Sequence, residues 1–246
     1  MTLSTLLRLP LRLIPPNQVL PVLSGPLRGR RWIAGSGVHA CWLGSYEADK
    51  QRLFSRLIQP GMVIYDAGAH VGFYTLLAAH LTGPRGHVLA IEPSPRNQAL
   101  LQRHIALNGY GDRVTLLAAA LAEQSGTLRF ATAGEQAYQG HLSAQGELTV
   151  QAVTLDELAA SGETPPPHLI KMDVEGAELN ALRGAADVLR HAQPMLMLAT
   201  HSTELQQSCC TLLAEYGYVV QTLPGSHDEL IAYPAARAAA FRELSA

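Results

Sequence analysis

The chain has 246 residues, of which 48% are hydrophobic and 15% are charged. This composition excludes a disordered chain and a soluble coiled coil, and it supplies enough apolar side chains for a sizeable core. Lys and Arg total 18 against 20 Asp and Glu, a formal net charge of -2. The chain therefore lacks the global basic field that steers proteins onto nucleic acid, and we expect no nucleic-acid partner.

Residues 1–40 are predicted to form an N-terminal extension, helical and packed on a single domain over residues 41–246. Weak peripheral contact of residues 1–14 with a membrane is the alternative, because apolar and basic side chains alternate there. No apolar run reaches the ~20 residues of a membrane-spanning helix. The cysteines Cys41, Cys209 and Cys210 form no disulfide framework or metal pattern, so we expect a cytoplasmic protein. A homo-oligomer is left open.

Short apolar runs alternate with helical patterns from residue 60 onward. The runs at 62–66, 86–92 and 113–117 predict buried strands, and the segments 71–81 and 97–107 predict the helices between them. Pro93 and the pair Asn108-Gly109 mark the ends of the second strand and the second helix. This alternation is typical of a parallel sheet with helices on both faces.

The middle of the chain differs, and the last third resumes the pattern. Short alternating strands are predicted at 127–130 and 148–155, and the polar stretch 131–147 between them is a candidate cover for a bound acceptor. Strands at 169–173 and 195–199 and helices at 177–189 and 203–216 follow. The final runs, 218–223 and 229–233, predict an antiparallel pair. The sequence thus predicts an α/β fold with a mostly parallel, doubly wound sheet and an antiparallel C-terminal edge pair.

The turn after the first strand lies in the run Val63-Ile-Tyr-Asp-Ala-Gly-Ala-His-Val-Gly-Phe-Tyr-Thr75. Gly68 permits a tight turn, and Gly72 lets the next helix start close to the strand. Their spacing differs from the Gly-x-Gly-x-x-Gly of dinucleotide sites. A carboxylate at Asp66 would repel a diphosphate and attract an ammonium or sulfonium charge, and S-adenosylmethionine carries both. Glu92, at the end of the second strand, is placed to accept both ribose hydroxyls.

A second polar run, Leu169-Ile-Lys-Met-Asp-Val-Glu-Gly-Ala-Glu178, ends the strand predicted at 169–173. Alternate residues of a strand share a face, so Lys171, Asp173 and Glu175 point the same way if the extended backbone continues. Three ionisable groups there are costly unless they are paired or used. An ion pair made by Lys171 is the structural alternative. Because this strand ends at the same crevice as the first run, we favour a catalytic role.

Together these runs resemble the FkbM-type methyltransferases, within the larger class of S-adenosylmethionine-dependent enzymes with a Rossmann-like fold. The matching pieces are Gly44-Ser-Tyr-Glu47, Tyr65-Asp-Ala-Gly-Ala-His-Val-Gly-Phe-Tyr-Thr75, Ile91-Glu-Pro93, Val153-Thr-Leu-Asp-Glu-Leu158 and Ile170-Lys-Met-Asp-Val-Glu-Gly-Ala-Glu178. The last piece is specific to the family, whereas Asp-x-Gly-x-x-x-Gly marks the wider class. The resemblance implies a class I methyltransferase fold and methyl transfer from S-adenosylmethionine to a hydroxyl of a sugar, a glycan, a lipid-linked acceptor or a natural product.

The resemblance also implies roles for individual residues. The cofactor is expected to contact Asp66, Gly68, Ala69, His70, Gly72, Thr75, Glu92, Asn108, Ala119 and Ala120. The acceptor is expected to face Lys171, Asp173 and Glu175, and Tyr46 and Glu47 are expected to close over the methionine end.

One position departs from the family's pattern. After the strand at 195–199 the family often has Glu-x-His, whereas this chain has Ala199-Thr200-His201. His201 is our first candidate for the catalytic base, because imidazole titrates near neutral pH. Asp173 is the second, with Lys171 steadying a developing alkoxide. A divalent metal held by Asp173, Glu175 and His201 fits by ligand type but is not favoured.

Two other functions stay open. A non-catalytic subunit that binds S-adenosylmethionine and supports a partner is one, because of the Glu missing at Ala199. A nucleotide-linked dehydrogenase is the other, and it predicts tight binding of a dinucleotide and none of S-adenosylmethionine.

Overall fold

The computed structural model describes residues 14–132, 140–142, 145–223, 225–239 and 241. Its central sheet has seven strands in the order β12-β13-β11-β10-β3-β4-β5. These strands are β3 (Val63–Ala67), β4 (His87–Ile91), β5 (Val114–Leu117), β10 (Leu169–Met172), β11 (Met195–Ala199), β12 (Tyr218–Thr222) and β13 (Glu229–Pro234). Strands β11, β10, β3, β4 and β5 pair in parallel, and β13 runs antiparallel to both of its neighbours. The predicted sheet with its antiparallel C-terminal pair is confirmed.

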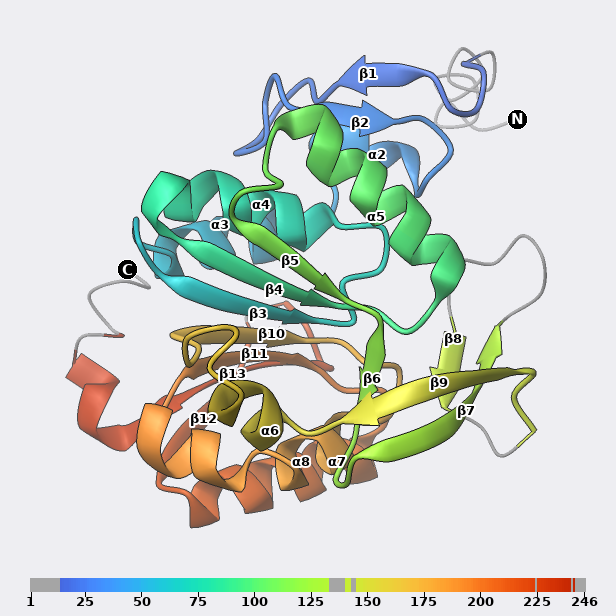
Figure 1. Ribbon diagram of the computed structural model, residues 1–246. Coiled ribbons are helices and arrows are strands. Elements are labelled where there is room, and N and C mark those ends of the chain that lie inside the picture. Colours follow the sequence, from blue (N-terminus) through green and yellow to red (C-terminus); the bar gives the residue numbers. More distant parts are fainter. Residues whose placement is uncertain (1–13, 133–139, 143–144, 224, 240, 242–246) are drawn as a thin grey trace, which may run out of the picture.

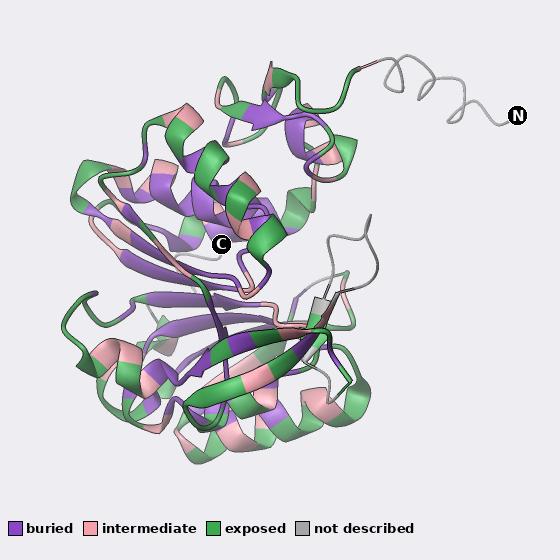
Figure 2. Cartoon of the chain, turned by 45° about the vertical axis from the view of Figure 1, so that its right-hand side comes forward, coloured by how far each residue is buried: buried purple, intermediate pink, exposed green. Residues whose placement is uncertain are grey.

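Helices cover both faces of this sheet (Figure 1). One layer holds α3 (Ala48–Leu57), α4 (Phe73–Thr82), the short η2 (Gly83–Arg85) and α5 (Pro95–Asn108), and the other holds α6 (Leu155–Ala160), α7 (Glu178–Arg183) and α8 (Thr203–Glu215). Buried residues collect in the strands between the layers (Figure 2). Strand β3 is buried at every position, which explains its near-continuous apolar sequence. No helix in the described part of the chain is long and apolar enough to cross a bilayer.

A second sheet, which the sequence did not predict, stands beside the first (Figure 1). It has the order β6-β9-β7-β8, made of β6 (Ala119–Leu121), β7 (Gly126–Thr132), β8 (Gly140–Leu142) and β9 (Leu148–Val153). Only one residue separates β5 from β6, so the chain leaves the main sheet and at once pairs in parallel with β9. Residues 133–139 and 143–144, within the expected acceptor cover, lie outside the described part of the chain.

Two helices differ from the prediction. Helix α6 begins where a strand was expected to continue, because Thr154 accepts the backbone N–H of Glu157 (3.0 Å) in a capping box. The helix predicted at 177–189 ends at Gly184, and the π-helical turn η3 (Val188–Ala192) follows. A Cβ at position 184 would lie 2.3 Å from the carbonyl oxygen of Ala122. Only glycine fits this close approach. Because glycine is a weak helix former, the helix ends there.

The N-terminal extension is not helical between residues 19 and 33, so that prediction is wrong there. Strands β1 (Val19–Pro21) and β2 (Arg31–Ile33) form an antiparallel pair, and helix α2 (His39–Leu43) follows. Prolines and glycines between residues 15 and 29 break helices and favour turns, which accounts for the difference. Residues 1–13, the segment considered for membrane contact, lie outside the described residues. Trp32 on β2 is fully buried in the larger of the core clusters.

The imidazole of His104 on α5 joins this extension to the main domain. The fully buried ring bonds at Nδ1 to the carbonyl oxygen of Val71 (2.7 Å), and its Nε2 accepts from the backbone N–H of Ile33 (3.0 Å). It also stacks on Trp32, with ring centroids 4.1 Å apart. One donated and one accepted bond require a neutral imidazole with its proton on Nδ1.

We expect the free energy of unfolding to fall as the pH drops from about 6.5 to 4. Burial lowers the pKa of His104 from 6.5 to about 4. Between these values the unfolded chain binds a proton that the folded chain does not bind. The contribution of neutral His104 to the free energy of unfolding is therefore complete above pH 6.5 and is lost as the pH falls through 4. It amounts to about 3 kcal/mol at most. Urea unfolding across this range, on the wild type and on His104→Gln, measures it. Identical pH profiles would contradict the assignment.

Candidate functional site

A cavity of about 690 Å³ lies at the carboxyl edge of the parallel strands. Its volume is within the range of about 300–1,000 Å³ typical of small-molecule and cofactor sites. The loop after β3, the end of β4, strand β6 and the residues after β10 and β11 all contribute to it. Because β13 is antiparallel, its first residue, Glu229, also lies at this edge. Residues 37–47 of the N-terminal region supply a further wall.

The turn after β3 fits only because two of its residues have no side chain. Gly68 has φ +71°, and a Cβ there would lie 1.8 Å from the carbonyl oxygen of Asp173. Gly72 has φ +98°, and a Cβ there would lie 2.3 Å from Leu101 Cδ1. The loop therefore packs directly against the end of β10 and against α5.

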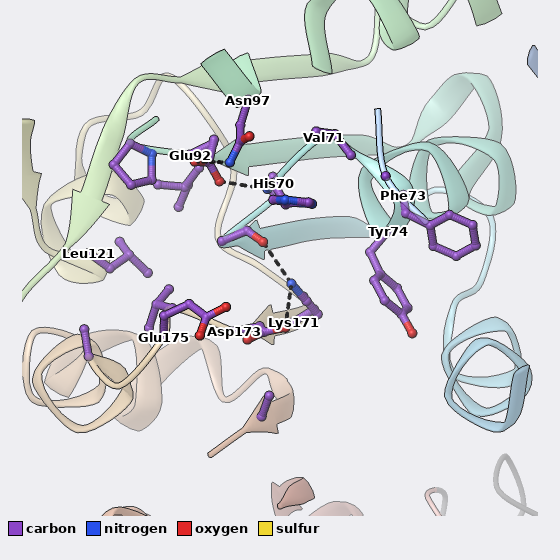
Figure 3. Close-up of a pocket in the computed structure, with 18 of the residues that line it drawn as sticks. His70, Val71, Phe73, Tyr74, Glu92, Asn97, Leu121, Lys171, Asp173 and Glu175 are labelled. Atoms are coloured by element: carbon purple, nitrogen blue, oxygen red, sulfur yellow. Dashed lines mark hydrogen bonds and ion pairs between the residues drawn. The ribbon is translucent and has the colours of Figure 1, made fainter. Parts of the chain in front are cut away.

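The carboxylate of Glu92, at the end of β4, is held in place by three donors. Its Oε2 accepts the backbone N–H of His70 (2.8 Å), and its Oε1 accepts the N–H of Ser94 (2.9 Å) and Asn97 Nδ2 (3.2 Å) (Figure 3). Burial raises the pKa of Glu92, and these donors oppose that effect only in part. A carboxylate has about four acceptor positions, so a fixed Glu92 that lines the cavity can still accept from a ligand's hydroxyls.

Asp66 and Lys171 form a buried pair, of which only Lys171 lines the cavity. They are neighbours in the register of β3 and β10, and Lys171 Nζ lies 3.5 Å from Asp66 Oδ1. Thr75 Oγ1 donates to Asp66 Oδ2 (2.6 Å), and Lys171 Nζ donates to the carbonyl oxygen of Gly68 (3.0 Å). Burial lowers the pKa of Lys171, but Asp66 and Asp173 outweigh it, so the pKa is raised. Asp66 is fully buried and, like Thr75, does not line the cavity, so the geometry does not support the expected contact with a cofactor.

Three carboxylates surround His201, which follows the end of β11. Its Nε2 lies 3.2 Å from Glu175 Oε2 and 3.6 Å from Asp173 Oδ1, and its Nδ1 lies 3.2 Å from Glu178 Oε1. Burial alone would raise the pKa of Asp173, but the surrounding positive charges, Lys171 first and Lys50 next, together outweigh it and the pKa is lowered. Burial, and then Asp173, raise the pKa of Glu175. The structure thus assembles the predicted acceptor-side residues and adds Glu178 to them.

Glu178 has no role assigned from sequence beyond its place as the last residue of the polar run that ends the strand predicted at 169–173. The structure buries it completely, and its Oε1 accepts the backbone N–H groups of Val174 (3.1 Å) and Gly176 (3.2 Å). An acid two and four residues after these donors is a local signal that sequence reasoning could have used. Glu178 is therefore anchored by the turn after β10 while its carboxylate meets His201.

The wall over the cavity is held by Lys50, the only lysine besides Lys171. Lys50 Nζ lies 2.5 Å from Glu229 and 3.5 Å from Glu47, and Tyr74 donates its hydroxyl to Glu47 Oε2 (2.7 Å). Burial, with Glu47 next, raises the pKa of Tyr74. This network, in which Lys50 is itself buried, connects α3, α4 and β13.

The carboxylate of Glu229 lies beside Ala199, the position at which the family often has Glu. Ala199 on β11 pairs in register with Glu229 on β13, and both line the cavity. Paired residues of antiparallel strands project from the same face. The neighbouring strand therefore supplies an acid next to the missing one.

Backbone strain gathers at the cavity. Among the described residues, five that are not glycine have positive φ, and three of them line the cavity: Glu47 (φ +45°), His70 (φ +54°) and Glu175 (φ +52°). Such conformations disfavour side-chain-bearing residues and concentrate at functional sites.

The structure brings most of the predicted site residues together. Those that line the cavity are Gly68, Ala69, His70, Glu92, Ala119, Ala120, Lys171, Asp173, Glu175 and His201. Asp66, Gly72, Thr75 and Asn108 do not line it. The prediction for Asn108 is corrected: its amide oxygen and nitrogen bond the backbone N–H and carbonyl of Arg31, so it fastens the N-terminal hairpin. Lining residues that the sequence did not single out include Val38, Cys41, Phe73, Asn97 and Phe130.

The mainly parallel sheet, its reversed β13 and the charged cavity at the carboxyl edge define a class I methyltransferase fold. The crystal structure of methyltransferase FkbM from Methylobacillus flagellatus is similar, with a TM-score of 0.52 at 19% identity. The similarity covers 72% of this chain and 44% of that one, and it supports the fold alone.

The model of the methyltransferase FkbM domain matches residues 66–233, which is more than half of the chain. Hexuronic acid methyltransferase AglP from Haloferax volcanii is 30% identical over 188 residues, which cover 74% of each protein. Methyltransferase sdnD from Sordaria araneosa is 27% identical over 154 residues, 49% of this chain and 59% of that protein. This chain belongs to the FkbM methyltransferase family.

Proposed function

We propose that this protein transfers a methyl group from S-adenosylmethionine to a hydroxyl oxygen of a sugar, a glycan or a natural-product acceptor. The observation that carries the proposal is the fixed carboxylate of Glu92 at one side of a cavity that has Asp173 and Glu175 at the other (Figure 3). His201 lines the same cavity and lies beside these two acids. Glu92 accepts the ribose hydroxyls, as acidic residues at this position do in nucleotide-binding folds.

The charge of the cavity supports a cationic donor. Six carboxylates line it, and Lys171 is the one Lys or Arg among its lining residues in the described part of the chain. The acidic lining residues are Glu47, Glu92, Asp173, Glu175, Asp228 and Glu229. This excess attracts the ammonium and sulfonium groups of S-adenosylmethionine and repels the diphosphate of a dinucleotide. The selection first expected from Asp66 is thus reassigned to the lining carboxylates, since the charge of Asp66 is paired with Lys171.

The acceptor hydroxyl is placed among Asp173, Glu175 and His201, whose side chains are each about one-third exposed. Methyl transfer is an in-line displacement at the sulfonium methyl, so the protein aligns the oxygen and provides a place for its proton. This cluster of carboxylates and imidazole accepts that proton, and Lys171 keeps Asp173 ionised. A sugar acceptor is supported by the name of the relative AglP, a hexuronic acid methyltransferase.

We expect calorimetric binding of S-adenosylmethionine by the purified chain and no comparable binding of a nicotinamide dinucleotide. Methyl-labelled S-adenosylmethionine, supplied with neutral sugar, amino sugar, uronic acid and polyketide alcohols, should then label one acceptor class. Alkaline treatment of the product distinguishes methylation of a hydroxyl from methylation of a uronic acid's carboxylate, because a methyl ether resists alkali and a methyl ester is hydrolysed. The variant His201→Ala should bind the donor with near wild-type affinity and lose transfer.

Three results would contradict this proposal. Preferential binding of the dinucleotide would favour a dehydrogenase. Donor binding without labelling of any acceptor would favour a non-catalytic subunit. Full transfer by His201→Ala would remove the acceptor-side assignment.

A further inference from the structure

The cluster around His201 carries more negative charge than one imidazole can neutralise. Asp173, Glu175 and Glu178 all lie within 3.6 Å of its ring nitrogens. Among the described residues, Lys171 Nζ is the other cation within 4 Å of these carboxylates, but it lies 3.9 Å from Asp173 Oδ2 and closer, at 3.5 Å, to Asp66. Even a protonated imidazole leaves carboxylates in excess, and a half-buried excess charge is costly unless a cation compensates it.

A second observation concerns one oxygen atom of Glu178. The side chain is fully buried, and Oε1 is used by two backbone N–H groups and by His201. The other oxygen, Oε2, is buried and has no hydrogen-bond partner among the described residues. A buried carboxylate oxygen without a donor is costly, and a cation that reaches it would remove that cost.

We propose that Asp173, Glu178 and His201 form a binding site for one divalent cation of the Mn²⁺ or Mg²⁺ type. One ligand atom from each of the three residues lies within 4.8 Å of the other two. The structure thereby replaces Glu175, the third ligand considered from sequence, with the buried Glu178. Two carboxylates and one imidazole are ligands that such cations accept.

Cation binding requires the three ligand atoms, now within 4.8 Å of one another, to move closer together. An octahedral cation with bonds of about 2.1 Å places adjacent ligand atoms about 3 Å apart. His201 already lies 3.2 Å from Glu178 and 3.6 Å from Asp173, although through different ring nitrogens. The His201 side chain is 35% exposed and lies beyond the end of β11, so part of it faces solvent.

This arrangement leaves open coordination positions toward the cavity, which Asp173 and His201 line. Three protein ligands occupy half of an octahedron, and water or vicinal hydroxyl oxygens complete it. A hydroxyl bound there becomes more acidic, since the cation stabilises the alkoxide. The site therefore suits an acceptor that offers two adjacent oxygens, which deepens the proposed function without depending on it for its test.

The test uses Mn²⁺ alone, with neither methyl donor nor acceptor. The full chain is treated with a chelator, desalted and titrated with Mn²⁺, while the signal of free Mn²⁺ is followed by electron paramagnetic resonance. We expect one site per chain. His201→Ala, Asp173→Asn and Glu178→Gln should each weaken binding about 100-fold or more, since even outer-shell partners are worth about 10- to 100-fold.

Matched controls are available for each kind of change. His191→Ala removes an exposed imidazole, and Glu204→Gln alters an exposed carboxylate on α8, so both should keep the wild-type affinity for Mn²⁺. Nitrogen coupling in the pulsed spectrum of bound Mn²⁺ should disappear in His201→Ala. Circular dichroism shows which variants remain folded, and Asp173→Asn serves if Glu178→Gln does not fold.

Two results would overturn the proposal. One is the absence of Mn²⁺ binding by the wild type at millimolar concentration. The other is binding that persists equally in folded His201→Ala and Asp173→Asn. Either result would leave the cluster as His201 paired with carboxylates and without a cation, and the proposed methyl transfer would stand or fall by its own experiment.

Discussion

Glu92→Gln is expected to weaken binding of S-adenosylmethionine by about 10- to 100-fold. Hydrogen bonds to a charged acceptor contribute about 1.5–3 kcal/mol, and about 1.4 kcal/mol corresponds to tenfold in affinity. The amide also places an NH₂ group against the N–H of His70 or Ser94, both of which donate to the carboxylate now. Isothermal titration calorimetry of the purified variant measures the loss.

The control for this change is Glu204→Gln, which makes the same replacement at an exposed carboxylate on α8 and should leave the affinity unchanged. A Glu92→Gln protein that is folded and binds the donor as tightly as the wild type would remove the ribose assignment.

Lys171→Met is expected to lower the free energy of unfolding by about 3–5 kcal/mol. The substitution removes the cation beside Asp66, whose side chain has no exposure at all, and leaves a buried carboxylate uncompensated. Denaturant unfolding monitored by circular dichroism measures the change. The double variant Asp66→Asn/Lys171→Met should recover most of the loss, because no unpaired charge then remains in the core.

The same substitution at the other lysine is the comparison. Lys50→Met should cost less, because the side chains of its partners Glu47 and Glu229 are 33% and 18% exposed. Equal losses in the two single variants, or a double variant no more stable than Lys171→Met, would contradict the account of Asp66 and Lys171.

Local patterns predicted the main sheet well because its strands are buried runs bounded by clear turns. The predicted strand at 195–199 coincides with β11, and the run at 62–66 differs by one residue at each end from β3. Helix α6 was missed although its signal, Thr154 followed three residues later by Glu157, is present in the sequence. The alternating pattern of the preceding strand led us to extend that strand to residue 155, over the capping box.

Pairings between distant segments were not predictable in the same way. The second sheet depends on β6 meeting β9, and the hairpin of β1 and β2 depends on Asn108 and His104 some seventy residues later. A single sequence contains the donors and acceptors but not their partners.

The candidate site shows the same division. Glu92, Asp173 and His201 were predicted because parallel strands bring their carboxyl ends to one edge. Glu229 was missed because it begins an antiparallel strand, whose first residue reaches that edge. Asp66 was placed at the correct strand end, but its side chain turns to Lys171 rather than to the cavity.

The left-handed backbone at Glu47, His70 and Glu175 has a consequence for engineering. Each such residue lowers the free energy of unfolding by roughly 1–2 kcal/mol relative to glycine. The three together therefore cost a sizeable part of the free energy of unfolding of a typical domain, which is about 5–15 kcal/mol. Replacing His70 or Glu175 with glycine would relieve this strain and raise thermal stability, and it would also remove a side chain that lines the cavity. A screen for thermostability alone would therefore favour changes that alter the lining of the cavity.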